Sequence, residues 1–444
     1  MAGLQTRIGD KVADPRDREH HDATVWMVVL LAGLSTSVLA VAARADLGTD
    51  APPFLLHYQP FVSPRLLFPL LVIAAVLWTA TRRWAARLRW RGLLALSYLG
   101  SLSWLVSLAL LRGADGLTRY VRDADGYTPP VDTTETISEI LASLSQPDGH
   151  ASTSVTGHPP GPAILLWSLK ILPVSDLVAG LIWTGLAALT VPLVLLAARS
   201  ACGRPAARRL APVLILAPYA LWMAVGPDAI TAMLGAGALA AACLASDRHR
   251  RGWPAFGLAL VAGLLLAAAT LFAYIAAWLG LSMVCLYFAR RRPWHNLATG
   301  AVALVPLLVA QAAGFDWATG LTEAYEGFLG RVEAGRSLWW WIPLSITVLV
   351  IACGPAVVAG FRKLRNTPGW PFLAGSCAAI VFSIVAGIAR GGVEQTWLVF
   401  FPWLTIAATA PAVPGGRPLP APLRLAAIGG MTAVVVGSVL VSPW

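Results

Sequence analysis

Long apolar runs separated by short polar segments set the pattern of this chain. A helix needs about 20 apolar residues to cross the roughly 30 Å hydrocarbon core of a membrane. Runs of this kind occupy residues 25–45, 65–81, 92–111, 178–198, 210–225, 229–245, 253–270, 272–289, 297–313, 338–360, 369–388, 397–413 and 425–442. The pattern therefore predicts an all-α polytopic membrane protein with about 13 transmembrane helices.

Composition excludes the other broad classes of protein. Of the 444 residues, 57% are hydrophobic and only 12% are charged, against roughly 25% charged residues in soluble domains. A chain with so few charges cannot cover itself with a polar surface, and it is too hydrophobic to be disordered. Outer-membrane barrels show alternating segments of about ten residues, which the unbroken runs exclude.

The positive charges indicate the orientation in the membrane. Lys and Arg outnumber Asp and Glu by 33 to 22, and most of the excess lies in short loops. These loops are 82–91, 199–209, 248–251, 290–292, 362–365 and 417–424, and the alternation of spans places all of them on one face. The positive-inside rule makes this face cytoplasmic, together with the tail 1–24, so the basic charge indicates topology and not a nucleic-acid partner.

The same alternation decides the role of residues 161–173, an apolar segment bracketed by prolines. If this segment crossed the membrane, every later arginine-rich loop would lie outside, so we expect a helix in the outer interface. It belongs to the long outer loop 112–177. After its cytoplasmic tail, we divide the chain into three parts. A transmembrane core occupies 92–413, two transmembrane helices in 25–91 are additional to this core, and a C-terminal transmembrane helix occupies 414–444.

The sequence lacks the common motifs of cofactor binding and nucleophilic catalysis. There is no nucleotide-binding loop, dinucleotide fingerprint, zinc-protease motif or serine nucleophile elbow. The five cysteines show no metal-ligand spacing and no disulfide framework, so we interpret them as small core residues. Candidate chemistry therefore lies in the outer loops.

The densest charged motif follows the third apolar run and contains Asp115, Arg119, Arg122, Asp123 and Asp125. A carboxylate can act as a general base, and arginines can grip a phosphate. The Asp-x-Asp pair at 123 and 125 can hold a divalent cation such as Mg²⁺ or Mn²⁺. The alternative is a solvated loop whose charges neutralise one another.

Polar residues at other outer turns are further candidates. His158, before two prolines, can contact a phosphate or relay a proton, or it is an ordinary surface histidine. Asp228 lies at a tight turn, as a site residue or a helix N-cap. Arg390 and Glu394 form an opposed pair in a short turn. Trp339 opens a span, where indoles are usually belt residues but also pack on sugar faces.

Three segments carry a resemblance to a known family. Residues 157–162 are Gly-His-Pro-Pro-Gly-Pro, residues 314–317 are Gly-Phe-Asp-Trp, and residues 393–403 are Val-Glu-Gln-Thr-Trp-Leu-Val-Phe-Phe-Pro-Trp. With the acidic loop before them, they resemble the GT-C superfamily of membrane glycosyltransferases. This superfamily includes protein mannosyltransferases and aminoarabinose transferases, and the segments also resemble actinobacterial integral membrane proteins of this type. The resemblance covers roughly residues 92–403 and departs at Gly161, where many relatives have Leu.

The resemblance implies a GT-C-like core and inverting transfer of a sugar from a polyprenyl-phosphate donor. The acceptor would be an envelope glycan, lipid or protein on the outer face of the plasma membrane. A base early in the first large outer loop is also implied, so the catalytic candidates are Asp115, Asp123 and Asp125. The chemistry further needs cations on the leaving phosphate and polar groups around the substrate. We expect these from Arg119, Arg122, His158, Asp228, Trp339, Arg390 and Glu394.

A transporter or flippase of an envelope lipid or lipid-linked sugar is the alternative, because it would use the same outer cavity without chemistry. A structural envelope scaffold is a third interpretation, in which the acidic loop would be dispensable. The loop carboxylates discriminate among these classes, since only an enzyme loses turnover and keeps lipid binding when its base is removed.

Overall fold

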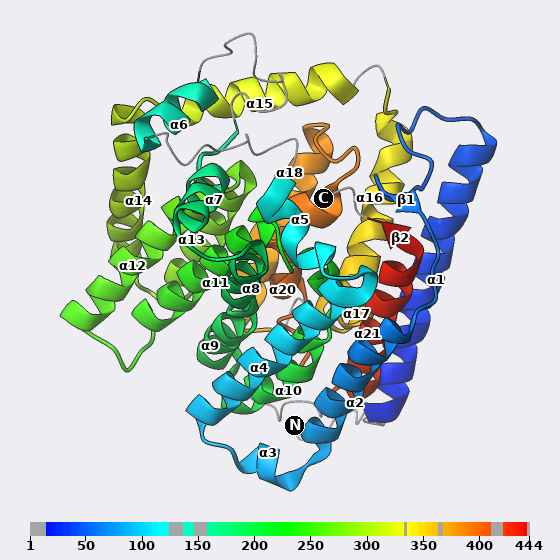
Figure 1. The fold of residues 1–444 in the computed structure, drawn as a ribbon. Coiled ribbons are helices and arrows are strands. Elements are labelled where there is room, and N and C mark those ends of the chain that lie inside the picture. Colours follow the sequence, from blue (N-terminus) through cyan, green and yellow to red (C-terminus); the bar gives the residue numbers. More distant parts are fainter. Residues whose placement is uncertain are drawn as a thin grey trace, which may run out of the picture.

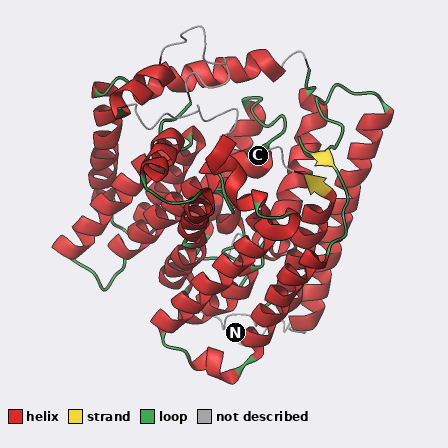
Figure 2. Ribbon diagram, in the orientation of Figure 1, coloured by secondary structure: helices red, strands yellow, loops and turns green. Residues whose placement is uncertain are grey.

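The structure, a computed structural model, describes residues 15–123, 136–145, 158–332, 335–362, 367–409 and 421–441. Helices form almost all of its regular structure (Figure 2). The one sheet in the described part pairs two short antiparallel strands, β1 (His57–Tyr58) and β2 (Leu440–Val441). The predicted all-α class is therefore confirmed.

Seven helical segments of the described chain are long and apolar enough to cross a membrane. They are α1 (Pro15–Ala42), η1 (Pro64–Leu66) with α2 (Leu67–Thr81), α4 (Trp90–Ala109) with η2 (Leu110–Arg112), α8 (Asp176–Ala188) with α9 (Thr190–Cys202), α11 (Pro227–Ala245), α12 (Trp253–Thr270) and α14 (Trp294–Ala312). At a rise of about 1.5 Å per residue, such lengths match the hydrocarbon core. The chain has the helical, multi-pass character of a membrane protein.

Four shorter apolar helices fall on further predicted runs. They are α13 (Leu279–Ala289) preceded by η4 (Tyr274–Trp278), α16 (Leu338–Cys353), α18 (Trp370–Val385) and α21 (Leu423–Val439). A six-residue helix, α17 (Ala356–Phe361), follows α16 after Gly354, whose positive φ of 65° ends the longer helix. The predicted number of spans is therefore supported by helix length only at the seven long segments.

Two further predicted spans are not continuous helices. The run 210–225 is divided between α10 (Arg204–Ile215) and η3 (Pro218–Trp222). Pro212 lies inside α10 and Pro218 begins η3, and a proline lacks the N–H that a continuing helix needs. The chain therefore breaks its helix in the middle of this apolar run.

The predicted span 397–413 departs further from a helix. Its described part, residues 397–409, contains only the four-residue helix α20 (Phe401–Leu404) between turns. Trp397, Phe401 and Trp403 are completely buried. Irregular backbone is tolerated at membrane depth only where protein surrounds it, so this segment runs through the interior of the bundle and does not face lipid.

Four of the arginine-rich loops, 82–91, 199–209, 248–251 and 290–292, meet at one end of the bundle, which we call the arginine end. Arg208 donates a hydrogen bond of 2.8 Å to the carbonyl oxygen of Ala85, and Arg290 donates one of 3.0 Å to the hydroxyl of Ser200. The short helix α3 (Arg83–Arg87) lies at this end (Figure 1). The fold thus brings together four of the loops that the charge pattern assigned to one face.

The opposite end, which we call the loop end, carries the short helices of the long loops. These are α5 (Asp115–Asp123), α6 (Ile137–Ser145), α7 (Gly161–Ile171), α15 (Trp317–Val332) and α19 (Val393–Thr396). In Figure 1, α15 crosses this end from α14 to α16. The helix predicted over 161–173 is α7, which at about 1.5 Å per residue is too short to cross a membrane.

Cysteine labelling tests the predicted orientation of the two ends. We expect Glu326→Cys, on an exposed position of α15, to react with a membrane-impermeant maleimide in intact cells once the native cysteines are replaced. The matched variant Arg250→Cys, exposed at the arginine end, should react only after lysis. The reverse labelling pattern would invert the predicted topology and remove the outer-face site with it.

Candidate functional site

The structure does not describe the side chains of two of the three predicted catalytic aspartates. Asp125 lies outside the described residues, and Asp123 is the last residue of α5, with a side chain that is also outside them. Within the described part, no three His, Cys, Asp or Glu side chains gather as metal ligands. The cation site at Asp123 and Asp125, with its Mg²⁺ or Mn²⁺, stays a prediction.

Helix α5 separates charged from apolar residues. Asp115, Arg119 and Arg122 are exposed, whereas Leu117 and Tyr120 are buried. Asp115 begins the helix, where the aligned backbone N–H groups favour a negative charge. Arg119 lies one turn later on the same face. The exposed face therefore places a carboxylate beside a guanidinium, as a site for a hydroxyl acceptor and a phosphate requires.

Two glycines let α5 lie very close to the spans beneath it. A Cβ atom on Gly116 would overlap the carbonyl of Ala109 at the end of α4. A Cβ on Gly180 of α8 would overlap the carbonyl of Leu117 in α5. Backbone cannot yield as a flexible side chain can, so glycine at these positions fixes the height of α5 over the bundle.

We expect Gly180→Ala to lower the stability of the protein by about 1–3 kcal/mol, the usual effect of overpacking. The new methyl group would push α5 away from α8 and displace Asp115 with it. The matched control is Gly257→Ala in α12, where nothing lies within 4 Å of the added Cβ. Thermal unfolding in detergent measures both variants, and equal midpoints would contradict the close approach of α5 and α8.

Trp183 of α8 connects α5 to the turn before α11. Its ring packs edge-on against Tyr120 with centroids 5.3 Å apart. Its indole N–H donates a 2.8 Å hydrogen bond to the carbonyl oxygen of Gly226. Thr184 donates to the carbonyl of Ala224 in the same turn, at 2.9 Å. Sequence patterns did not single out Trp183, because a tryptophan inside an apolar run carries no local sign of such a role.

Asp228 lies at the second position of α11 and does not act as its N-cap. Gly226 is the capping residue, and no side chain caps this helix end. The N-cap interpretation of Asp228 is therefore wrong, because Pro227 begins the helix one residue earlier than expected. The carboxylate still lies in the first turn, where the helix dipole stabilises a negative charge.

Glu394 of α19 is the most unusual acid of the site. Its side chain is completely buried, and no other described residue donates a hydrogen bond to either carboxylate oxygen. Burial raises the pKa of Glu394 to about 7, its own backbone N–H partly opposes this rise, and the nearby Asp228 carboxylate adds to it. The fold thus brings together Asp228 and Glu394, which are far apart in the sequence.

Arg390 does not pair with Glu394, although the sequence places them four residues apart. Gly391 and Gly392 both adopt positive φ, at 95° and 70°, and turn the chain between the two side chains. Arg390 instead donates to the carbonyl oxygen of Arg336 at 3.4 Å, and Arg336 donates to that of Arg390 at 3.0 Å. The predicted opposed pair is therefore wrong, and Arg390 joins its turn to the segment before α16.

His158 is half-buried at the start of α7. The backbone N–H of Gly161 donates a 2.7 Å hydrogen bond to the carbonyl oxygen of Leu271, which ties α7 to the end of α12. A Cβ on Gly161 would overlap that carbonyl and the ring of Phe272. This close approach explains why glycine stands where the resemblance expects leucine. Leu166 of α7 then packs in the same apolar cluster as the α5 side chains.

Trp339 does not belong to the apolar cluster of α5 and α7, because its side chain is exposed. Its side chain is 82% exposed at the start of α16, whereas Trp341 in the same turn is completely buried. An indole this exposed at a helix end fits the belt interpretation better than a role in the site.

Comparisons with known proteins identify no relative of this chain. No family model, no curated protein and no solved structure matches this chain. The fold and the loop end define a multi-pass helical membrane protein with charged residues on a short helix, α5, and a buried acid, Glu394, in another.

Proposed function

We propose that the protein is an inverting glycosyltransferase of the GT-C type, acting on a polyprenyl-phosphate sugar at the outer face of the plasma membrane. The acceptor is an envelope glycan, lipid or protein. The observation that carries this proposal is the arrangement at the loop end. There the exposed Asp115 and Arg119 are connected through Trp183 to the turn that holds Asp228, and Asp228 lies near Glu394.

The exposed residues of α5 suit the two charges of the reaction. Asp115 accepts the proton of the acceptor hydroxyl, whose oxygen attacks the anomeric carbon from the face opposite the phosphate. The bond from that carbon to the phosphate oxygen breaks, and its electron pair stays on the phosphate. Arg119 and Arg122 stabilise this charge, because a guanidinium binds phosphate through two parallel hydrogen bonds.

Two further acids, the buried Glu394 and the half-buried Asp228, complete the proposed site. A carboxyl group whose pKa lies about 7 is half-protonated at neutral pH, so Glu394 can donate or accept a hydrogen bond with a sugar hydroxyl. Asp228 lies in the first turn of α11, and its carboxylate oxygens can accept hydrogen bonds from the substrate. His158, half-buried at the start of α7, is the candidate that would contact the phosphate of the donor.

Transport of a lipid-linked sugar is the second candidate, and Glu394 is the observation that favours it. Ionisable residues inside membrane proteins frequently mark proton or substrate pathways. A buried acid with a pKa of about 7 would exchange a proton at physiological pH as a substrate enters and leaves. In this case the charges of α5 select the substrate without chemistry.

Purified protein incubated with a panel of radiolabelled polyprenyl-phosphate sugars and envelope acceptors distinguishes the two functions. We expect release of label from the lipid to the acceptor with one donor of the panel. Reconstituted vesicles with a fluorescent donor lipid measure movement between leaflets in parallel. Movement without label transfer across the whole panel would replace the glycosyltransferase by the transporter.

A further inference from the structure

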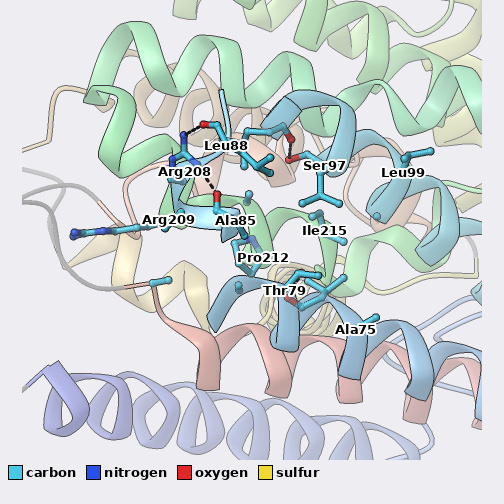
Figure 3. A pocket seen from close by; sticks show the side chains of 18 of the residues that line it. Ala75, Thr79, Ala85, Leu88, Ser97, Leu99, Arg208, Arg209, Pro212 and Ile215 are labelled. Atoms are coloured by element: carbon cyan, nitrogen blue, oxygen red, sulfur yellow. Dashed lines mark hydrogen bonds between the residues drawn. The ribbon is translucent and has the colours of Figure 1, made fainter. Parts of the chain in front are cut away.

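A large groove lies at the arginine end, away from the candidate site at the loop end. It runs between α2, α4 and α10 and has a volume of about 1090 Å³ (Figure 3). Small-molecule pockets usually measure roughly 300–1,000 Å³, so the groove is large for a soluble metabolite. It therefore has room for a ligand with long chains.

The walls of the groove suit hydrocarbon. Its lining is dominated by side chains such as Leu71, Val76 and Ile215. Two of its hydroxyl groups are turned to their own helices, since Thr79 donates to the carbonyl of Val76 and Ser97 to that of Leu93, both at 2.8 Å. These hydroxyls are therefore satisfied without a ligand.

The mouth of the groove carries concentrated positive charge. Among the described residues that line it are Arg87, Arg204, Arg208 and Arg209, and none of the lining residues is acidic. Arg208 is held in place by bonds to the carbonyls of Ala85 and of Leu88, as Figure 3 shows. Arg204 and Arg87 are exposed, and Arg209 extends outward from the groove in the same view.

Arg204 and Arg208, one turn apart on α10, repel one another at this groove. Burial lowers the pKa of Arg208, and the nearby Arg204 lowers it further, which reports this repulsion. An anion at the mouth would relieve it, and arginine forks match the geometry of phosphate oxygens. Basic pockets between helices on the cytoplasmic side of membrane proteins bind anionic lipid head groups for this reason.

We infer that this groove binds one anionic phospholipid of the inner leaflet, with its phosphate at Arg204 and Arg87 and its acyl chains between α2, α4 and α10. The apolar walls select the chains and the arginines select the head group. The site depends on neither proposed function, because it shares no residue with the loop end. An ordinary boundary lipid would show no such preference for charge.

Native mass spectrometry of the purified full-length protein tests this site with phosphatidylglycerol and phosphatidylcholine of identical chains. We expect phosphatidylglycerol to bind roughly tenfold more tightly or better, as several arginines near one phosphate require. The double variant Arg87→Gln/Arg204→Gln should lose this preference. The matched double variant Arg248→Gln/Arg250→Gln, exposed at the same end but outside the groove, should keep it.

A second variant tests the apolar walls. Ala75 lines the groove on α2, and Ala75→Trp should reduce binding of both lipids by filling the space for a chain. Equal affinity for the two lipids in the parent protein, or an unchanged preference in Arg87→Gln/Arg204→Gln, would overturn the proposal. A polyprenyl phosphate that displaces phosphatidylglycerol at a tenth of its concentration would overturn the assignment to a phospholipid.

Discussion

We expect the Asp115→Asn variant to transfer sugar about 10²–10⁴-fold more slowly than the parent protein, the usual effect of removing a positioned general base. Asparagine keeps the size and hydrogen-bonding shape of the side chain and removes only the charge. Asp115 is exposed on α5, so the variant should fold normally. The measurement is the initial rate of label transfer at saturating donor.

Asp176→Asn is the matched control for this experiment. Asp176 is also an exposed aspartate at the first position of a helix, α8, so the substitution makes the same change to a helix end. It should leave the rate within a factor of about two and test the general effect of charge at a helix N-terminus. A normal rate in Asp115→Asn would remove Asp115 from catalysis and direct the same test to Asp125.

Replacing Glu394 by glutamine should make the protein more stable at pH 8 but not at pH 5. The folded state holds the proton of Glu394 up to a pKa of about 7, whereas the unfolded chain releases it near 4.5. The folded protein therefore loses stability as the pH rises through this interval, by on the order of 3 kcal/mol above pH 7. Glutamine carries no charge and avoids this loss.

Thermal unfolding in detergent at several pH values checks the prediction for Glu394. The advantage of Glu394→Gln over the parent protein should be small at pH 5 and grow to its full size between pH 5 and pH 8. The exposed Glu326→Gln in α15 is the control and should show no such dependence. A constant difference at all pH values would mean that the carboxyl group of Glu394 is ionised throughout.

The sequence predicted the long spans well because their signal is local. An apolar window of about 18 residues needs no partner to be recognised. This reasoning fails for the segment 397–409, because an irregular segment that protein buries on all sides is as apolar in composition as a transmembrane helix. Only the surrounding helices determine that Trp397 donates to the hydroxyl of Ser383 and that Trp403 stacks on Phe372.

The residue types of the candidate site can be read from the sequence, but the contacts between them cannot. Charges at outer turns identified Asp115, Asp228 and Glu394, since polar residues beside membrane spans are costly without a reason. Their relation depends on distant contacts, such as the bond from Trp183 to Gly226. No spacing rule relates residue 183 to residue 226. The spacing of Arg390 and Glu394 suggests an ion pair, but the positive φ angles of the two glycines after Arg390 turn the two side chains apart.

The buried segment 397–409 also constrains how the chain enters the membrane. Each backbone polar group without a hydrogen-bond partner in hydrocarbon destabilises the structure by several kcal/mol. This segment therefore cannot be exposed to lipid in its final conformation. Its neighbours come from distant parts of the chain, because Phe401 stacks on Tyr219 and Thr409 donates to the carbonyl of Ala206. Biogenesis therefore has an order, in which the earlier helices are inserted first and the 397–409 stretch settles only once they have assembled around it.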